Sequence, residues 1–225
     1  MSEKLRQVML AVPAYDGKVV CDFSVGIAEI FRLAKENGFE LHLRYLMYDS
    51  LIHISRNSLL TTAYEEGVDD VVFIDADQGF TSDAFFAALK HPVDVVGIPV
   101  RNKDEEVLFN IRPHEVERHE FNVELGLLEV EAIGTGFLRL TRNAIQILRD
   151  SSPAYGDNQR MVCNTQIING QLISEDIQIC NKLQAAGLKV YVDINHTCDH
   201  FGTKKWSGSY KDYYVFQLLE QSRKG

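Results

Sequence analysis

The sequence predicts an α/β fold with a mostly parallel sheet, and two observations lead to that prediction. In the first hundred residues, short apolar runs alternate with longer segments whose apolar residues recur at helical spacing. In residues 101–225, extended runs follow one another with fewer helical segments between them, which favours additional mixed or antiparallel strands. No linker or internal repeat separates the two halves, so we expect residues 1–225 to form a single domain with helices flanking one sheet.

The first half of the chain contains the parallel strands. The predicted strands are short apolar or alternating runs, at residues 7–14, 40–47, 70–74 and 93–99. The predicted helices carry apolar residues at helical spacing, at residues 21–37, 51–66 and 82–90. Gly38 and Gly67 directly follow two of these helices, where glycine is favoured because it readily adopts a left-handed conformation. Helical crossovers between neighbouring parallel strands imply right-handed connections.

The second half is expected to add mixed strands to the same sheet. Asn169-Gly170 separates two short extended runs, which is typical of a two-residue β-hairpin turn. Ser174 is a suitable N-cap for a helix that stops at Gly187. The remaining predicted elements are extended runs at 107–112, 127–133 and 188–194 and helices at 141–149 and 209–222.

Charge and cysteine usage exclude several classes of function. The chain has 23 basic and 32 acidic residues, a net charge of −9, so binding to nucleic acid or anionic membranes by bulk charge is not expected. The 4 cysteines form no CxxC pair, which argues against a zinc ribbon and favours reduced thiols. No apolar run approaches the roughly 20 residues that a membrane span needs, nor a signal-peptide core. We therefore expect a soluble, cytoplasmic protein.

Asp75 and Asp77 follow directly after the buried run 70–74. In open α/β sheets, ligands bind beyond the carboxyl ends of the strands, and two carboxylates two residues apart in an extended segment project to the same side. Such a pair suits a hard divalent cation that keeps positions free for phosphate oxygens. The alternative is that both aspartates only make a turn.

Glu175 and Asp176 open the helix that Ser174 precedes. Acidic residues are favoured in a first helical turn by the helix dipole, and a helix start also holds a catalytic carboxylate in place. Both interpretations fit the sequence.

His200 follows the last predicted strand, and Lys204, Lys205 and the only tryptophan come soon after it. A single histidine after a strand is often structural, but lysines are expected beside a bound phosphate. This segment is therefore a candidate for binding a metal ion and a diphosphate.

Gly134 and Gly136 follow an apolar strand, where glycines either let a ligand approach the backbone or make a β-bulge. Arg56 and Asn57 lie early in the helix 51–66, where they either face solvent or reach phosphates.

Taken in order, these motifs resemble those of the GT-A glycosyltransferases, above all small stand-alone members from bacteria, phages and large algal viruses. The resemblance covers nearly the whole chain and is carried by Pro13-Ala14-Tyr15, Ile54-Ser55-Arg56-Asn57, Phe73-Ile74-Asp75-Ala76-Asp77, Gly134-Thr135-Gly136-Phe137, Glu175-Asp176 with Cys180, and Val190-Tyr191-Val192-Asp193 leading to His200-Phe201-Gly202. It implies a single GT-A-like domain with a Rossmann-like sheet. Residues 1–100 would then form a nucleotide-binding half, and residues 101–225 an acceptor and metal half.

The resemblance also implies an activity and a cytoplasmic location, which would be the host cytoplasm for a viral member. A sugar would be transferred from a UDP- or GDP-linked donor to a hydroxyl of a saccharide or another acceptor, with Mn²⁺ or Mg²⁺ as cofactor. Asp176 would be the general base of an inverting transfer, and Glu175 would orient the acceptor or the helix start. The implied metal ligands are Asp75, Asp77 and His200. The implied donor-binding residues are Pro13, Ala14, Tyr15, Arg56, Asp75, Gly134, Gly136, Lys204 and Lys205.

Three alternatives are weighed against this interpretation. A phosphohydrolase of the haloacid-dehalogenase type also uses a DxD, but that motif follows its first strand, whereas Asp75 follows the third predicted strand here. A sugar nucleotidyltransferase would need a Gly-rich basic loop after the first strand, and residues 12–18 contain none. A binding module that kept a nucleotide pocket without turnover remains compatible with the sequence.

Overall fold

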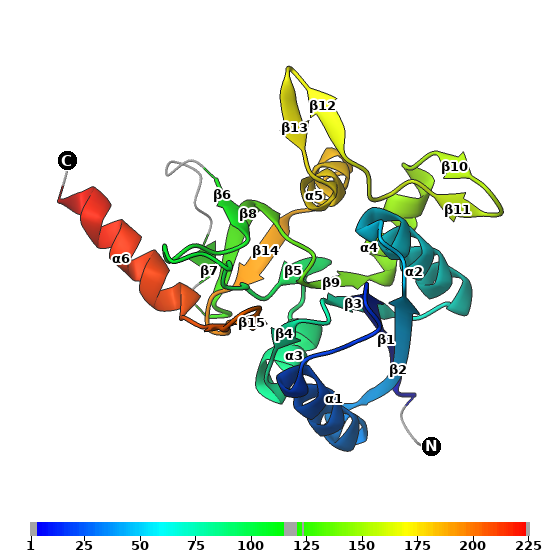
Figure 1. Cartoon of the computed structure of the whole chain (residues 1–225), viewed down its shortest axis with the longest axis horizontal. Helices are drawn as coiled ribbons and strands as arrows, with labels where there is room; N and C mark the ends of the chain where they lie inside the picture. Colours follow the sequence, from blue (N-terminus) through cyan, green and yellow to red (C-terminus); the bar gives the residue numbers. More distant parts are fainter. Residues whose placement is uncertain (1–3, 115–120, 123, 224–225) are drawn as a thin grey trace.

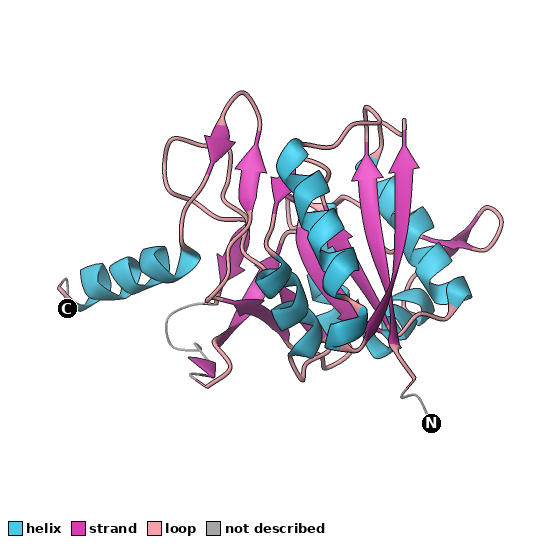
Figure 2. Ribbon diagram, turned by 90° about the horizontal axis from the view of Figure 1, so that it is seen from below, coloured by secondary structure: helices cyan, strands magenta, loops and turns pink. Residues whose placement is uncertain are grey.

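The computed structural model describes residues 4–114, 121–122 and 124–223, which form three layers with the main sheet in the middle (Figures 1 and 2). Helices α1 (Cys21–Leu33) and α3 (Ser82–Lys90) cover one face of the sheet. Helices α2 (Ile52–Glu66), α4 (Arg142–Asp150) and α5 (Glu175–Ala185) cover the other. The predicted arrangement of helices flanking a sheet is confirmed.

The main sheet has the strand order β2-β1-β3-β9-β5-β14-β8-β6, with the short β7 (Phe121–Asn122) paired to β8. The bounds in that order are Phe39–Met47, Arg6–Ala14, Asp70–Ile74, Phe137–Thr141, Val95–Gly97, Val190–Asp193, Leu127–Ile133 and Ile111–Pro113. Strands β2, β1, β3, β5 and β14 run in one direction, while β9 and β8 run antiparallel to their neighbours. The sheet is thus mostly parallel, and strands from both halves of the chain interleave in it.

Strand β1 illustrates how the sequence produces this layered core. Val8 and Leu10 pack in the cluster under α1 and α3, whereas Met9 and Ala11 pack in the cluster under α2, α4 and α5. Alternate side chains of a strand point to opposite faces, so a central strand with helices on both sides must be apolar at every position. That requirement explains the unbroken apolar run in this segment.

Most predicted helices and turns lie where the sequence predicts them, and two details differ. The segment predicted as one helix, 21–37, is an α-helix to Leu33 followed by the 3₁₀ turn η1 (Lys35–Asn37), after which Gly38 has φ 89°. The hairpin β12 (Gln166–Ile168) and β13 (Gln171–Ile173) is confirmed, and both turn residues between its strands have positive φ. Ser174 occupies the N-cap position of α5, but its side chain makes no capping hydrogen bond.

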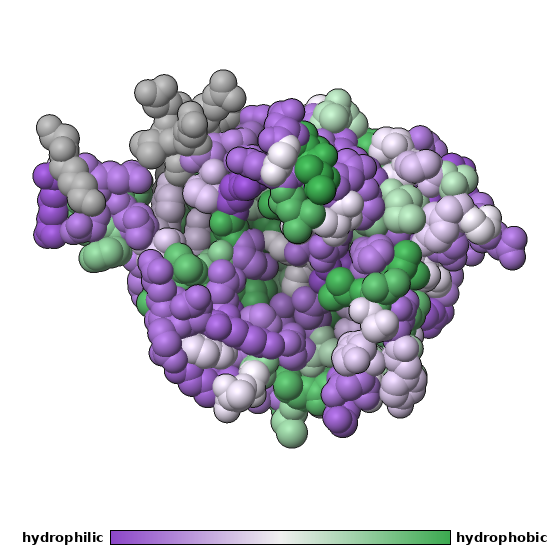
Figure 3. Space-filling view, turned by 45° about the horizontal axis from the view of Figure 1, so that its top comes forward, coloured by the Kyte–Doolittle hydropathy of each residue, from purple (hydrophilic) through white to green (hydrophobic). Residues whose placement is uncertain are grey.

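Smaller elements surround the main sheet. Strands β4 (Gln78–Gly79), β15 (Asp199–Phe201) and β16 (Lys205–Trp206) form a separate sheet, and β10 (Ala154–Tyr155) and β11 (Gln159–Arg160) form a hairpin. The C-terminal helix α6 (Tyr210–Ser222) extends away from the body of the molecule (Figures 1 and 2). None of the helices in the described ranges is both long and apolar enough to cross a membrane. The face seen in Figure 3 is hydrophilic over most of its area, with hydrophobic side chains gathered in a few patches.

Candidate functional site

The Asp75-Ala-Asp77 segment forms a turn at the carboxyl end of β3. The backbone N–H of Gln78 donates to the carbonyl of Asp75 at 3.2 Å, and the N–H of Asp75 donates to the carbonyl of Gly136 at 2.9 Å. The sequence predicts an extended conformation here, and the backbone forms a turn instead, although Asp75 and Asp77 still line one cleft. Because the chain turns here, the two carboxylates reach different partners.

Asp77 forms a pair with His200. Oδ2 of Asp77 lies 3.4 Å from Nε2 of His200 and 2.5 Å from Nζ of Lys103. Burial opposes the charge of Asp77, but the contacts with His200 and Lys103 outweigh it and lower the pKa of Asp77 to about 2. Asp77 is therefore an anion at neutral pH. The sequence analysis did not assign Lys103 to the site, since that lysine follows the fourth predicted strand without a recognisable motif.

Backbone pairing explains why His200 meets Asp77. In the small sheet, His200 is the register partner of Gln78, and the N–H of Phe201 donates to the carbonyl of Asp77 at 2.8 Å. Nδ1 of His200 lies 3.0 Å from the carbonyl oxygen of Arg101. A carbonyl can only accept, so Nδ1 of His200 donates to it, and Nε2 is the ring nitrogen that faces Asp77.

Arg56 joins the other three acidic residues of the site. Its side chain is 3% exposed, its Nη1 lies 3.0 Å from both Glu175 and Asp176, and its Nη2 lies 3.1 Å from Asp75. Burial opposes the charge of the guanidinium, but the carboxylates outweigh it and raise the pKa of Arg56 above its ordinary value. Neighbouring Asn57 is fully buried and binds the backbone of Cys163 through both ends of its amide.

Asp176 is held by a second donor that the sequence analysis did not identify. The hydroxyl of Thr135, a fully buried residue, donates to Oδ1 of Asp176 at 2.5 Å. The flanking glycines make room for neighbouring protein atoms. A Cβ on Gly136 would lie 2.2 Å from Nε2 of Gln78, and one on Gly134 would lie 2.9 Å from Nδ2 of Asn110.

Two clefts open on either side of this network of charges. The Asp75 cleft has a volume of about 530 Å³, and the Asp176 cleft has about 250 Å³. The Asp75 cleft is lined by Pro13, Tyr15, Asp16, Lys18, Val19, Val20, Ile52, Asp75, Ala76, Asp77 and His200. The Asp176 cleft is lined by Phe109, Asn110, Ile111, Arg112, Ala132, Ile133, Gly134, Ser174, Asp176 and Ile177.

Ala14, Lys204 and Lys205 do not line either of these clefts. Ala14 is buried, and its carbonyl accepts from the N–H groups of Gly17 and Tyr48. Lys204 binds Glu105 at 2.7 Å, and Lys205 binds Asp199 at 2.7 Å.

The donor set fits a divalent cation in part. Asp77 supplies a carboxylate and His200 a ring nitrogen, both of which Mn²⁺ accepts. The carboxylate of Asp75 instead contacts Arg56. Over the described parts of the chain, no three His, Cys, Asp or Glu side chains gather into a metal-binding group. The chain therefore brings together two of the three implied ligands, and the ion's other ligands would be water or phosphate oxygens.

Solved structures with a similar fold include several transferases. The viral protein A197 from STIV has a TM-score of 0.56 and 16% identity, over 88% of this chain and 86% of its own. The catalytic domain of Drosophila β1,4-galactosyltransferase 7, in complex with xylobiose, has a TM-score of 0.47 and 14% identity, over 85% of this chain and 66% of that chain. The structure of GalNAc-T7 with UDP, GalNAc and Mn²⁺ has a TM-score of 0.46 and 12% identity, over 89% of this chain and 44% of that chain.

No protein-family model matches the chain, and no curated protein matches it significantly in sequence. The α/β fold predicted from the sequence is confirmed.

Proposed function

We propose that this protein is a metal-dependent glycosyltransferase that uses a nucleoside-diphosphate sugar, UDP- or GDP-linked, and transfers the sugar to a hydroxyl acceptor. The observation that carries the proposal is the Asp77–His200 pair at the carboxyl end of β3, in a cleft large enough for a nucleotide. The fold supports it, since similar structures include glycosyltransferases solved with UDP and Mn²⁺.

The Asp75 cleft is the proposed donor site. Pro13 and Ala14 end β1, and Tyr15 follows them. Pro13 and Tyr15 line one wall of the cleft, where Tyr15, 70% exposed, offers an aromatic surface for a base. Asp75 would face the ribose, and Arg56 would act near the sugar and diphosphate through Asp75.

Asp77 and His200, with Asp75 as a third candidate, would hold Mn²⁺ or Mg²⁺ beside the diphosphate. A divalent cation there would neutralise the charge that develops on the departing diphosphate. Lys103, which contacts Asp77, supplies a positive charge at the same place.

The Asp176 cleft is the proposed acceptor site. Asp176 would act as the general base that takes the proton from the acceptor hydroxyl, in an inverting transfer, and Glu175 would orient the acceptor. Gly134 lines the Asp176 cleft and Gly136 lies beside Asp75, and the donor sugar would pass near both. Lys204 and Lys205 would approach the diphosphate when their loop moves.

The test is a thermal-shift titration of UDP and GDP with and without Mn²⁺, followed by an assay for nucleotide release from UDP-glucose, UDP-galactose and GDP-mannose. Nucleotide at about 100 times its dissociation constant should add about 2.7 kcal/mol of stability in the presence of Mn²⁺. Absence of any Mn²⁺-dependent stabilisation would overturn the proposal. Stabilisation without nucleotide release from any donor would instead identify a binding module without turnover.

A further inference from the structure

We infer that Arg56 and Thr135 are positioning residues that together hold one oxygen of Asp176 and thereby direct the other toward the acceptor. This inference rests on the proposed glycosyl transfer and names two residues that determine the direction of proton removal.

The contacts to Asp176 are one-sided. Its Oδ1 accepts from Nη1 of Arg56 at 3.0 Å and from the hydroxyl of Thr135 at 2.5 Å. Its Oδ2 has no hydrogen-bond partner within the part of the chain that the structure describes. The side chain is 27% exposed and lines the Asp176 cleft. A carboxylate fixed at one oxygen keeps the lone pairs of the other available to a ligand in that cleft.

Both donors are themselves held rigidly. Thr135 is fully buried, and the side chain of Arg56 is 3% exposed. In the described structure, Nε of Arg56 is buried without a partner, while both Nη atoms contact carboxylates. An arginine that only stabilised the fold would be expected to satisfy Nε as well, because an unmet buried donor costs about 1–3 kcal/mol. The guanidinium is therefore oriented for its Nη contacts.

The same guanidinium connects the two clefts. Nη2 binds Asp75, which lines one cleft, and Nη1 binds Asp176, which lines the other. The planar guanidinium of arginine can donate to carboxylates in two directions at once, whereas the ammonium of a lysine is a single point charge. Arg56 thus sets the position of the base relative to the donor side.

In the proposed chemical step, each bond that forms is matched by a bond that breaks. The acceptor O–H gives its proton to Oδ2 of Asp176, and the acceptor oxygen forms a bond to the anomeric carbon of the donor. The bond between that carbon and the diphosphate oxygen breaks, and its electron pair leaves with the diphosphate. Hydrogen bonds to Oδ1 fix the direction in which Oδ2 meets the proton.

The experiment compares Thr135→Val with Thr135→Ser in Mn²⁺, using the donor of the UDP- and GDP-hexose panel that wild type hydrolyses fastest. Valine removes only the hydroxyl donor, whereas serine keeps it. We expect Thr135→Val to lower kcat about 10- to 100-fold with the donor KM nearly unchanged, because the hydrogen bond to Asp176 is charge-assisted. Thr135→Ser should recover most of the activity.

Arg56→Lys provides the second variant. It should lower kcat at least as strongly as Thr135→Val and should also raise the donor KM, because Asp75 loses its partner. Urea unfolding of each variant separates this effect from loss of folded protein. Equal kcat for Thr135→Val and Thr135→Ser would overturn the inference even if Arg56→Lys fails to fold. A wild-type protein that binds nucleotide but hydrolyses no donor would overturn the proposed function, and the inference with it.

Discussion

Nε2 of His200 lies 3.4 Å from Oδ2 of Asp77, and the backbone rather than the side chains brings the two residues together. The N–H of Phe201 donates to the carbonyl of Asp77, so β15 is attached directly to the turn after β3. Rotation of the imidazole is restricted because Nδ1 contacts the carbonyl of Arg101. The pair is thus preorganised, as the two proposed ligands of a metal ion should be.

Asp77→Asn should abolish Mn²⁺-dependent nucleotide binding. An amide keeps the shape of the carboxylate but removes the charge that attracts the cation. Calorimetric titration of UDP and GDP with and without Mn²⁺ measures the effect. Asp16→Asn is the matched control, because Asp16 lines the same cleft but pairs only with the exposed Lys18 in the described structure. Unchanged nucleotide affinity of Asp77→Asn in Mn²⁺ would refute its role as a ligand.

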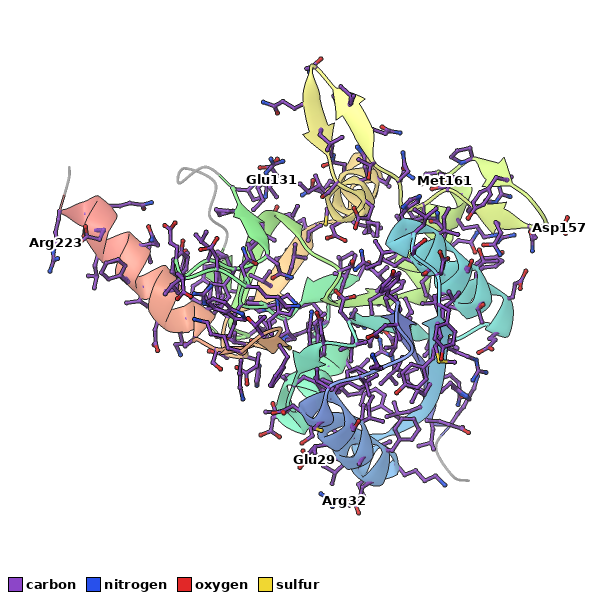
Figure 4. All side chains as sticks on the ribbon, in the orientation of Figure 1. Glu29, Arg32, Glu131, Asp157, Met161 and Arg223 are labelled. Atoms are coloured by element: carbon purple, nitrogen blue, oxygen red, sulfur yellow. The ribbon has the colours of Figure 1, made fainter. Side chains whose placement is uncertain are left out.

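Asp176→Asn should lower turnover by about 10² to 10⁴ while leaving donor binding nearly intact, since a positioned general base contributes that factor. Steady-state kinetics and nucleotide titration measure the two quantities separately. Asp157→Asn is the control, because Asp157 lies at the outer tip of the β10–β11 hairpin (Figure 4). Full turnover of Asp176→Asn, or a product that retains the anomeric configuration of the donor, would return Asp176 to a purely structural role.

The segment 202–208, which contains β16, should close over the donor when nucleotide and Mn²⁺ bind. Lys204 lies 3.9 Å from the ring centroid of Trp206 and pairs with exposed Glu105, a contact that a diphosphate could replace at little cost. Trypsin should therefore cleave after Lys204 and Lys205 more slowly in the complex. Cleavage at Arg223, beyond α6, serves as the internal control. Identical cleavage of the loop in both conditions would argue against closure.

The pH dependence of stability should reflect a buried cluster at the end of β14. Oδ2 of Asp193 lies 2.9 Å from Nε2 of His91 and 2.8 Å from Nδ1 of His196. Burial opposes the charge of Asp193, but hydrogen bonds from His196 and His91 outweigh it and hold the pKa of Asp193 far below its ordinary value. The hydrogen bond to Asp193 raises the pKa of His196, against the effect of burial and with a smaller contribution from Asp83.

The directions of these two pKa shifts determine how Asp193 and His196 contribute to the stability of the fold as the pH changes. The lowered pKa of Asp193 contributes stability above about pH 4, which is lost as the pH falls toward the pKa in the folded state. The raised pKa of His196 contributes stability below about pH 6.5, which is lost as the pH rises through the pKa in the folded state. The cluster therefore stabilises the fold most between these values.

Urea unfolding of Asp193→Asn and wild type at pH 5.5 and pH 8.5 tests this dependence. The variant should lose about 2 kcal/mol at pH 5.5, where a charged histidine meets the carboxylate, and less at pH 8.5. The control variant Asp157→Asn should match wild type at both pH values. Equal losses for Asp193→Asn at the two pH values would contradict the coupling with His196.

Local sequence signals predict most elements because their causes are local. The apolar run of β1 is required by burial on both faces, and the positive φ of Gly38 and Gly170 is accessible to glycine at little cost. The order of the strands in the sheet, in contrast, has no local cause. Strand β9 lies between β3 and β5 because of contacts between residues far apart in the chain, which no local pattern encodes.

For the candidate site, too, the sequence predicts one part and the tertiary structure decides the rest. The sequence by itself determined which acidic residues and which histidine stand at strand and helix ends, because charged groups there are visible in the pattern. Only the tertiary structure decided their partners. It turned Asp75 toward Arg56, brought Lys103 to Asp77, and placed the hydroxyl of Thr135 on Asp176. The physical reason is that the partner of a buried charge depends on the packing of distant segments, whereas the presence of that charge depends on a single position.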